Sequence, residues 1–336
     1  MLSTSHRIAV LGSGSWGTAL SIHLGHSGHR VSLWGRDAAL IEEMRSRRAN
    51  PTYLPDLTLP ATVTPEPSMA AALQDVQHIV MAVPSHGLRS VLRAAAPHLP
   101  ASAVLVSATK GLESGTLRRM SEIAFEETQG RYPVVVLSGP SFAAEVANKL
   151  PTALVAASSD PSAVCRVQED FRGPHLRLYG SDDVVGVEMG AALKNIIAIA
   201  AGVVESLGLG HNALAALITR GLAEISRLVY AMGGQRETLA GLSGLGDLVL
   251  TCTGTLSRNR HVGIELGRGR SLPDILGAMR MVAEGVRTTD AALALAARHG
   301  IELPIAAQMA EVLSGRTSPR AAVAELMLRP QRGEAE

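Results

Sequence analysis

The segment 190–203, GAALKNIIAIAAGV, holds the side chains with the clearest chemical potential. It is an apolar run with an ammonium, Lys194, and an amide, Asn195, near its middle. Apolar residues flank Lys194 on every side of the expected helix. A partly desolvated lysine loses proton affinity and can then act as an acid or base near neutral pH. A helical lysine can also extend its head group to water, so the pattern alone leaves both interpretations open.

Two further groups of candidates follow strand-like runs. Lys110 comes just after LVSAT, and Gly139 and Ser141 come just after VVVLS. Ligands bind at the carboxyl ends of the strands in an open parallel sheet, so these residues could contact a substrate. The backbone amides that follow Gly139 could hold an anion. The alternatives are an ordinary solvated lysine at 110 and a simple helix N-cap at Ser141.

A third group lies in the segment 241–263, GLSGLGDLVLTCTGTLSRNRHVG. Asp247 and Thr251 stand four residues apart, which places them on one face of a helix. They are followed by three polar neighbours, Ser257, Arg258 and Asn259. Arginine with adjacent hydroxyl and amide donors suits a phosphate monoester, whereas the alternative is a capped and solvated helix start. The segment lacks the GK[ST] of a P-loop, so we do not predict nucleotide hydrolysis.

The segment IAVLGSGSWGTALSIHL (8–24) predicts a dinucleotide-binding loop. It places Gly12, Gly14 and Gly17 between a strand and a helix. Gly12 permits the tight turn, Gly14 lets the backbone approach a pyrophosphate, and Gly17 lets the helix pack on the strand. The helix N-terminus then faces the phosphates. The alternative is a tight structural turn without a ligand.

The choice between NAD and NADP is made after the second expected strand. There VSLWGRD supplies Arg36, which suits the 2′-phosphate of NADP, and then Asp37, which suits the ribose of NAD. Arg36 comes first, so we predict NADPH; the alternative is a solvated surface arginine. Further along, VAEGV carries Val282 and Glu284 between two helical stretches. Glu284 could bind a ribose hydroxyl or only pair with Arg287.

The order of elements predicts two domains. In the first half, short β-branched runs alternate with helical segments, as in a doubly wound α/β domain, and runs such as VVVL indicate strands of a parallel sheet. After about Asp182, Ala, Leu and Ile recur at helical spacing. We predict a Rossmann-type domain over 1–185 and an all-helical C-terminal domain over 186–332. The expected strands are 7–12, 30–35, 78–84, 103–109, 133–139 and 152–158, and the expected crossover helices are 40–48, 88–98 and 117–128.

Composition excludes several other classes of protein. The net charge is +1, which gives no global field for nucleic acid. The two cysteines lie outside any CxxC and suit a reducing compartment, and the eleven histidines form no zinc motif, so we expect no metal. The apolar run 184–204 contains charged and amide side chains that are costly in lipid, so we expect no membrane insertion.

Motifs along nearly the whole chain resemble those of the bacterial NAD(P)-dependent glycerol-3-phosphate dehydrogenases. They are GSGSWGTA, WGRD, SATKGLE, GPSFAAEVA, EMGAALKNIIAIAAGV, LSGLGDLVLTCTGTLSRNRHVG and VAEGV, in this order. The resemblance implies reversible reduction of dihydroxyacetone phosphate to sn-glycerol 3-phosphate for glycerophospholipid synthesis in the cytoplasm. It further implies NADPH as cofactor, with NADH also accepted, and a homodimer formed through the helical domain, which also binds the substrate.

The resemblance also implies a role for particular residues. Lys194 would be the catalytic proton donor or acceptor, oriented by Asn195 and Asp247, because an ammonium there stabilises charge on a ketone oxygen. With the residues discussed above, the expected substrate site comprises Lys110, Gly139, Ser141, Lys194, Asn195, Asp247, Thr251, Ser257, Arg258 and Asn259. The expected cofactor site comprises Gly12, Gly14, Ser15, Trp16, Gly17, Arg36, Lys110, Ala143, Arg258, Val282 and Glu284.

Two alternatives remain open from the residues alone. The first is another dehydrogenase of the same two-domain build that acts on a different small acid or imine. The second is a non-catalytic NADP(H)-binding regulator, which would keep the glycine loop but has no need for Lys194 beside Asp247. Turnover of a phosphorylated ketone distinguishes both from the expected enzyme.

Overall fold

An eight-stranded sheet forms the centre of the first half of the chain. The computed structural model describes residues 5–279, 281–331 and 333. The strands lie in the order β10-β9-β8-β7-β6-β1-β2-β5 and neighbours are parallel except β8 and β9. The predicted doubly wound, Rossmann-type sheet is therefore confirmed. In chain order the strands are β1 (Arg7–Leu11), β2 (Arg30–Trp34), β5 (Val63–Glu66), β6 (His78–Met81), β7 (Val104–Ser107), β8 (Val134–Ser138), β9 (Thr152–Ala157) and β10 (Leu176–Ser181).

The strands that lie outside the predicted set are at the edges. β5 and β10 are the two ends of the sheet, and β3 (Ala49–Asn50) and β4 (Leu54–Thr58) form a separate small hairpin. β10 alternates buried with exposed residues, so it lacks the continuous apolar run of an interior strand. β5 contains Pro65, which an edge strand tolerates because one side of its backbone is unpaired.

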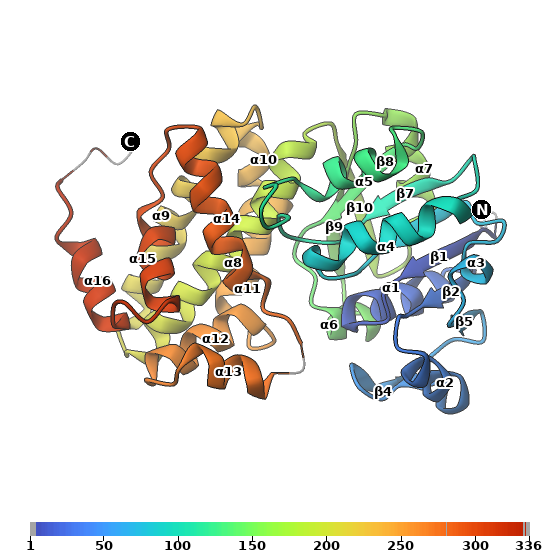
Figure 1. Cartoon of the computed structure of the whole chain (residues 1–336), viewed down its shortest axis with the longest axis horizontal. Helices are drawn as coiled ribbons and strands as arrows, with labels where there is room; N and C mark the ends of the chain where they lie inside the picture. Colours follow the sequence, from blue (N-terminus) through green and yellow to red (C-terminus); the bar gives the residue numbers. More distant parts are fainter. Residues whose placement is uncertain (1–4, 280, 332, 334–336) are drawn as a thin grey trace.

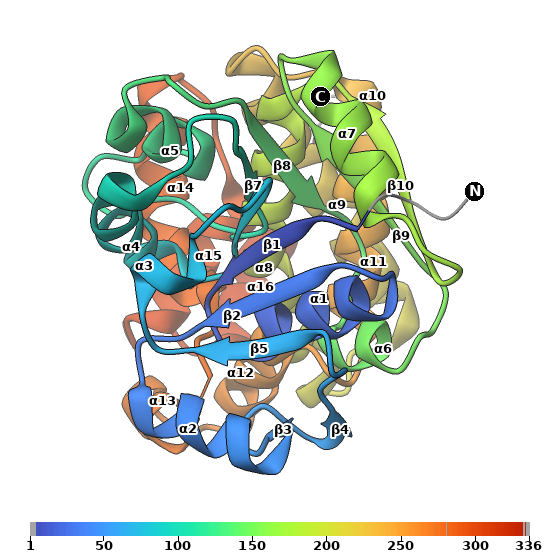
Figure 2. The same cartoon turned by 90° about the vertical axis from the view of Figure 1, so that its right-hand side faces the viewer.

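Helices cover both faces of this sheet. In Figure 2, α4 and α5 lie on one side of the strands, and α1 and α6 lie on the other. Two hydrophobic clusters reflect this arrangement, one between the sheet and α1, α2 and α7, the other between the sheet, α4 and α5. The helices of this half are α1 (Ser15–His26), α2 (Ala38–Arg47), α3 (Met69–Ala72), α4 (Leu88–Ala95), α5 (Met120–Thr128), α6 (Ala143–Ala147) and α7 (Pro161–Phe171).

Backbone conformation corrects the predicted helix ends. The helix expected from residue 117 begins only at Met120, because Leu117 has φ +63°, in the left-handed region. The helix expected to end at residue 48 stops at Arg47, because Arg48 adopts φ +53°. α4 ends at Ala95, and a short 3₁₀ turn continues to His98.

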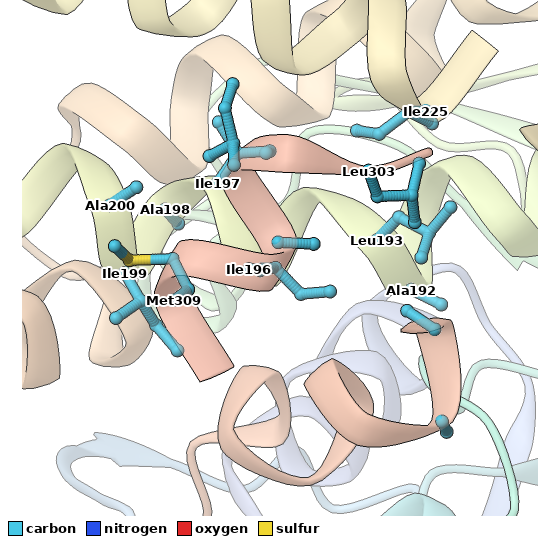
Figure 3. Packing of buried hydrophobic residues seen from close by; sticks show 14 of the residues in the cluster. Ala192, Leu193, Ile196, Ile197, Ala198, Ile199, Ala200, Ile225, Leu303 and Met309 are labelled. Carbon is cyan, nitrogen blue, oxygen red and sulfur yellow. The ribbon is translucent and has the colours of Figure 1, made fainter. Parts of the chain in front are cut away.

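The second half is all helical, and its central element is α8. Figure 1 shows these helices gathered beside the sheet domain, and Figure 3 shows Leu193, Ile196 and Ile197 of α8 close to Ile225 and Leu303. The helices are α8 (Val184–Ser206), α9 (Gly210–Ala231), α10 (Arg236–Ala240), α11 (Asp247–Thr253), α12 (Arg258–Gly267), α13 (Leu272–Ala278), α14 (Glu284–Arg298), α15 (Pro304–Leu313) and α16 (Pro319–Met327), with a π-helical turn η3 (Leu242–Gly246) before α11.

α8 is long and apolar enough to span a membrane by composition, but it is packed as a core helix. Its most apolar window is 89% buried inside the chain. α12 approaches it very closely, since a Cβ on Gly202 would overlap the carbonyl oxygen of Arg260, and one on Gly263 would overlap that of Ile199. Glycine at both positions therefore lets α12 pack closely against the C-terminal half of α8.

Candidate active site

One carboxylate, Asp247, joins two lysines from different domains. Asp247 Oδ1 lies 2.5 Å from Lys194 Nζ on α8, and Asp247 Oδ2 lies 2.7 Å from Lys110 Nζ after β7. The side chains of Lys194 and Asp247 are 7% and 1% exposed, whereas that of Lys110 is 21% exposed. The group carries two positive charges and one negative charge, so it offers a net positive site at the domain boundary.

The protonation of Lys194 reflects this environment. Burial lowers the pKa of Lys194 to about 8, Asp247 opposes that shift, and the ammonium of Lys110 adds to it. The lysine can therefore exchange a proton near neutral pH. The neighbouring Cys252 has its pKa raised by burial to about 12, so it is a neutral thiol that takes no part in this exchange. The alternative that Lys194 extends its head group to water is wrong, because its side chain is buried.

Two further groups hold the lysines in place. Thr251 Oγ1 accepts a hydrogen bond from Lys194 Nζ (2.7 Å) and donates one to the carbonyl of Asp247 (2.6 Å). The carbonyl of Gly139 accepts hydrogen bonds from Lys110 Nζ and from the Ser141 hydroxyl, both at 3.0 Å. The N-cap of α6 is Phe142, so the alternative that Ser141 caps this helix is wrong.

A chain of amides connects α8, α12 and α14. Asn259 Nδ2 donates to Asn195 Oδ1 (2.9 Å), and Asn259 Oδ1 accepts from the backbone N–H of Gly285 (2.9 Å). Glu284, the first residue of α14, accepts hydrogen bonds from the backbone N–H (3.1 Å) and hydroxyl (2.6 Å) of Ser85. Glu284 therefore links the helical domain to the loop after β6.

The start of α12 presents a second cation beside these groups. Ser257 is the N-cap of α12 and accepts a hydrogen bond from the N–H of Arg260 (3.2 Å). The alternative of a capped and solvated helix start is therefore right about the cap and wrong about the solvation, because Ser257 and Asn259 are buried. Arg258 is exposed as a residue, although protein atoms lie around its guanidinium. This desolvation lowers the pKa of Arg258, while Glu284 and Tyr53 act in the opposite direction.

The glycine loop has the geometry that a dinucleotide requires. Gly12 has φ +122°, and a Cβ there would lie 2.8 Å from the carbonyl carbon of Ala82. A Cβ on Gly17 would overlap the carbonyl oxygen of Gly12, whereas Gly14 has no atom within 4 Å of its Cβ position. Gly12 and Gly17 are thus required by the turn itself, and Gly14 leaves open space at the helix N-terminus. These residues fit a pyrophosphate.

The remaining cofactor candidates surround this loop. Ser15 begins α1, and its hydroxyl lies 3.2 Å from Met281 Sδ, in the segment that also contains Val282. Trp16 and Ala143 pack against the core under the loop. Arg36 is exposed just after β2, whereas Asp37 caps α2 by accepting a hydrogen bond from the N–H of Leu40 (3.1 Å). The capping leaves Arg36 as the better placed of the two for a cofactor phosphate.

Sequence reasoning missed two residues that support the site. Ser85 holds Glu284, and its only sequence signal is its position just after β6. Glu188 is buried on α8, where it binds Arg119 and Ser121 of the sheet domain. Nothing local indicates that contact, because its partners stand more than sixty residues away in the chain.

A glycine loop on a doubly wound sheet, facing a buried lysine–carboxylate pair in a helical domain, defines a two-domain NAD(P)-dependent dehydrogenase. Residues 7–164 match the family model described as NAD-dependent glycerol-3-phosphate dehydrogenase N-terminus, and residues 183–324 match the corresponding C-terminus model. The chain belongs to the NAD-dependent glycerol-3-phosphate dehydrogenase family, as its motifs predict.

Curated relatives and solved structures agree with this assignment. The chain is 53% identical over 332 residues to a glycerol-3-phosphate dehydrogenase (NAD(P)+) of Koribacter versatilis, covering 98% of each chain. It is 50% identical over 332 residues to the enzyme of that name from Citrifermentans bemidjiense, covering 98% of this chain and 99% of the relative. The crystal structure of glycerol-3-phosphate dehydrogenase from Coxiella burnetii superposes with a TM-score of 0.93 at 42% identity, covering 97% and 99% of the two chains.

Proposed function

We propose that this chain catalyses the reversible reduction of dihydroxyacetone phosphate to sn-glycerol 3-phosphate with NADPH or NADH. Membership of the family supports the reaction, and the observation that carries the mechanism is the buried Lys194–Asp247–Lys110 group. A bound NAD(P)H supplies a hydride to the carbonyl carbon of the ketone. The product serves glycerophospholipid synthesis.

Lys194 is the proton donor in reduction and the acceptor in oxidation. Its ammonium has a pKa of about 8, so both protonation states are accessible in the working range. The positive charge stabilises the negative charge that develops on the ketone oxygen in the transition state. Asp247 and Thr251 hold the ammonium in one position, which lowers the reorganisation needed during the reaction.

The phosphate of the substrate binds between the two domains. Lys110 and Arg258 supply positive charge, and Ser257 and Asn259 supply hydroxyl and amide donors beside Arg258. A guanidinium with adjacent donors matches the three oxygens of a phosphate monoester. Gly139 and Ser141 line the same site through the loop that Lys110 contacts.

The glycine loop holds the cofactor pyrophosphate, and Arg36 favours NADPH over NADH by contacting the 2′-phosphate. Lys110, Ala143, Arg258, Val282 and Glu284 complete the cofactor site. We place the domain boundary at 185/186, close to the start of α8 at Val184. The enzyme works in the cytoplasm as a homodimer formed through the helical domain, with no stable membrane insertion and no nucleic-acid partner; light scattering tests the dimer.

The deciding experiment measures oxidation of NADPH, and in parallel NADH, with dihydroxyacetone phosphate. Rapid turnover with the phosphorylated ketone and none with unphosphorylated dihydroxyacetone is the expected result, because the phosphate contacts provide most of the specificity. Turnover only with another small acid or imine would show that the proposed substrate is wrong and would favour a different dehydrogenase of the same two-domain build. Tight NADPH binding without any turnover would favour the non-catalytic binding protein.

A further inference from the structure

A segment of the sheet domain, residues 111–119, is packed into the helical domain. We call this segment the strap. Its side chains Leu112 and Leu117 are 3% and 9% exposed and belong to the same hydrophobic cluster as the apolar residues of α8. In Figure 1 the loop between β7 and α5 reaches towards α8 and α14. Lys110, which contacts Asp247, immediately precedes the strap.

The strap is a closed loop whose two ends are tied together. Leu112 and Arg119 form an antiparallel bridge, and the N–H of Glu113 donates to the carbonyl of Arg118 (2.9 Å). The N–H of Leu117 donates in turn to the carbonyl of Glu113 (2.9 Å). Because the ends are paired, a displacement at Arg119 is transmitted to the start of the strap and therefore to Lys110.

The end of the strap is fixed to α8 by Glu188. One carboxylate oxygen of Glu188 accepts hydrogen bonds from Arg119 Nη1 (2.8 Å) and the Ser121 hydroxyl (2.6 Å). The other accepts the backbone N–H of Ser121 (2.8 Å). Glu188 is buried and precedes Lys194 by six residues on the same helix, which is about 9 Å along the axis.

A second anchor holds the strap to the sheet domain. Arg89 on α4 donates from Nε and Nη2 to the two carboxylate oxygens of Glu113, both at 2.7 Å. This is the paired geometry in which a guanidinium binds a carboxylate most strongly. The strap is therefore held from both domains, and Glu188 is its polar contact with the helix that carries Lys194.

We propose that Glu188 is a positioning residue, which holds the strap and thereby keeps Lys110 against Asp247 and Lys194. It acts through Arg119 and Ser121 and touches neither substrate nor cofactor. This inference rests on the proposed function only for its kinetic consequences. Without the Glu188 carboxylate, the end of the strap is released and Lys110 withdraws from Asp247.

Withdrawal of Lys110 has a measurable effect on Lys194. The titratable groups that act on Lys194 are Asp247 and Cys252 from α11 and Lys110, the residue that precedes the strap. Of these groups, Lys110 lowers the pKa of Lys194. The acids on the other helices packed against α8 are engaged elsewhere. Glu224 of α9 binds backbone N–H groups of α15, Glu265 of α12 binds two arginines, and Glu284 of α14 binds Ser85. Loss of Lys110 from the group therefore raises the pKa of Lys194.

The test compares Glu188→Gln with Glu224→Gln, a control that replaces another equally buried acid of the helical domain by its amide. The chain has three lysines, Lys110, Lys149 and Lys194. Lysine labelled with ¹³C therefore gives few side-chain signals, and the pKa of Lys194 is read directly by NMR titration. We expect Glu188→Gln to raise it by about half a pH unit or more and Glu224→Gln to leave it unchanged.

Kinetics provide the second measurement. In Glu188→Gln, kcat/KM for dihydroxyacetone phosphate should fall about tenfold or more, and the alkaline limb of its pH profile should move upward with the Lys194 pKa. Ser121→Ala removes one hydroxyl hydrogen bond and keeps the bonds from Arg119 and from the backbone N–H of residue 121 to the Glu188 carboxylate. We therefore expect it to fold and to give a smaller change in the same direction. Glu188→Asp should recover part of the loss.

An unchanged Lys194 titration in both Glu188→Gln and Ser121→Ala would overturn the proposal, even if both variants melt at a lower temperature, because a purely structural role predicts that outcome. If Glu188→Gln does not fold, Ser121→Ala decides. If the wild-type protein does not turn over dihydroxyacetone phosphate, the proposed function fails, while the NMR titration still tests the strap independently of activity.

Discussion

Replacing Lys194 with methionine removes the ammonium while keeping a side chain of similar length. The pKa of Lys194 is lowered from 10.5 to about 8, so at about 1.4 kcal/mol per pH unit the fold disfavours the charged lysine by about 3 kcal/mol. This penalty is fully present below pH 8, where the lysine is charged in both the folded and the unfolded chain. Asp247 keeps Lys110 as a partner, so no buried carboxylate is left unpaired.

We therefore expect Lys194→Met to be as stable as the wild type at pH 7, or more stable by up to about 3 kcal/mol. The rate of catalysis, in contrast, should fall. Loss of a positioned proton donor costs about 10²–10⁴-fold in rate, so kcat for dihydroxyacetone phosphate should fall by about 10³-fold. The affinity for NADPH should change by less than about threefold, because the glycine loop is untouched.

Urea unfolding followed by tryptophan fluorescence measures the free energy of unfolding. A continuous assay of NADPH oxidation measures kcat. Lys149→Met is the control, because Lys149 is exposed and far along the chain from Asp247, and it should change neither quantity. Turnover of Lys194→Met within tenfold of the wild type would refute the assigned role. A loss of stability of several kcal/mol would refute the claim that the buried charge is unfavourable.

The structure supports further predictions. Gly17→Ala should prevent folding or cofactor binding, because its Cβ would overlap a backbone oxygen of the loop, whereas Gly14→Ala should fold, with a normal melting temperature, and lose NADPH affinity measured by fluorescence titration. Arg36→Leu should raise KM for NADPH about tenfold or more and leave KM for NADH within about twofold. Burial lowers the pKa values of His23 and His29 below 6.5. The unfolded chain then binds more protons, so stability is lost as pH falls below 6.5; melting between pH 7.5 and 5 measures this, and His23→Gln should flatten the curve.

Local sequence patterns predicted the interior strands, the glycine loop and the helical half of this protein. The six predicted strands include every interior strand of the sheet. β1, β6, β7 and β8 are buried almost along their whole length, so their sequences are largely apolar. β2 and β9 are less buried and were predicted from their β-branched and apolar residues. The glycine loop was readable because a tight turn and a close helix contact each require glycine at a set position. The helical half followed from the spacing of its apolar residues. Edge strands such as β10 were not predicted, because one face of the strand is exposed and its sequence therefore lacks a continuous apolar run.

The candidate residues themselves could be found in the sequence, since a lysine in the apolar run of α8 is conspicuous. Their arrangement could not be derived from pattern alone. Asp247 is 53 residues from Lys194 and 137 from Lys110, and Glu284 is 199 residues from Ser85. The interpretation of Ser141 as a helix cap was wrong because its hydroxyl found a nearer partner in Gly139.

The sequence by itself thus determined the α/β and helical architecture, the glycine loop after the first strand and the presence of a chemically unusual lysine. Only the tertiary structure decided that Asp247 is shared by two ammoniums, that burial brings the pKa of Lys194 to about 8, and that Glu188 ties α8 to the strap. The physical reason is the separation along the chain over which each kind of interaction acts. Periodicity and turn chemistry act between neighbours in the chain, whereas charge sharing and desolvation depend on which distant segments pack together.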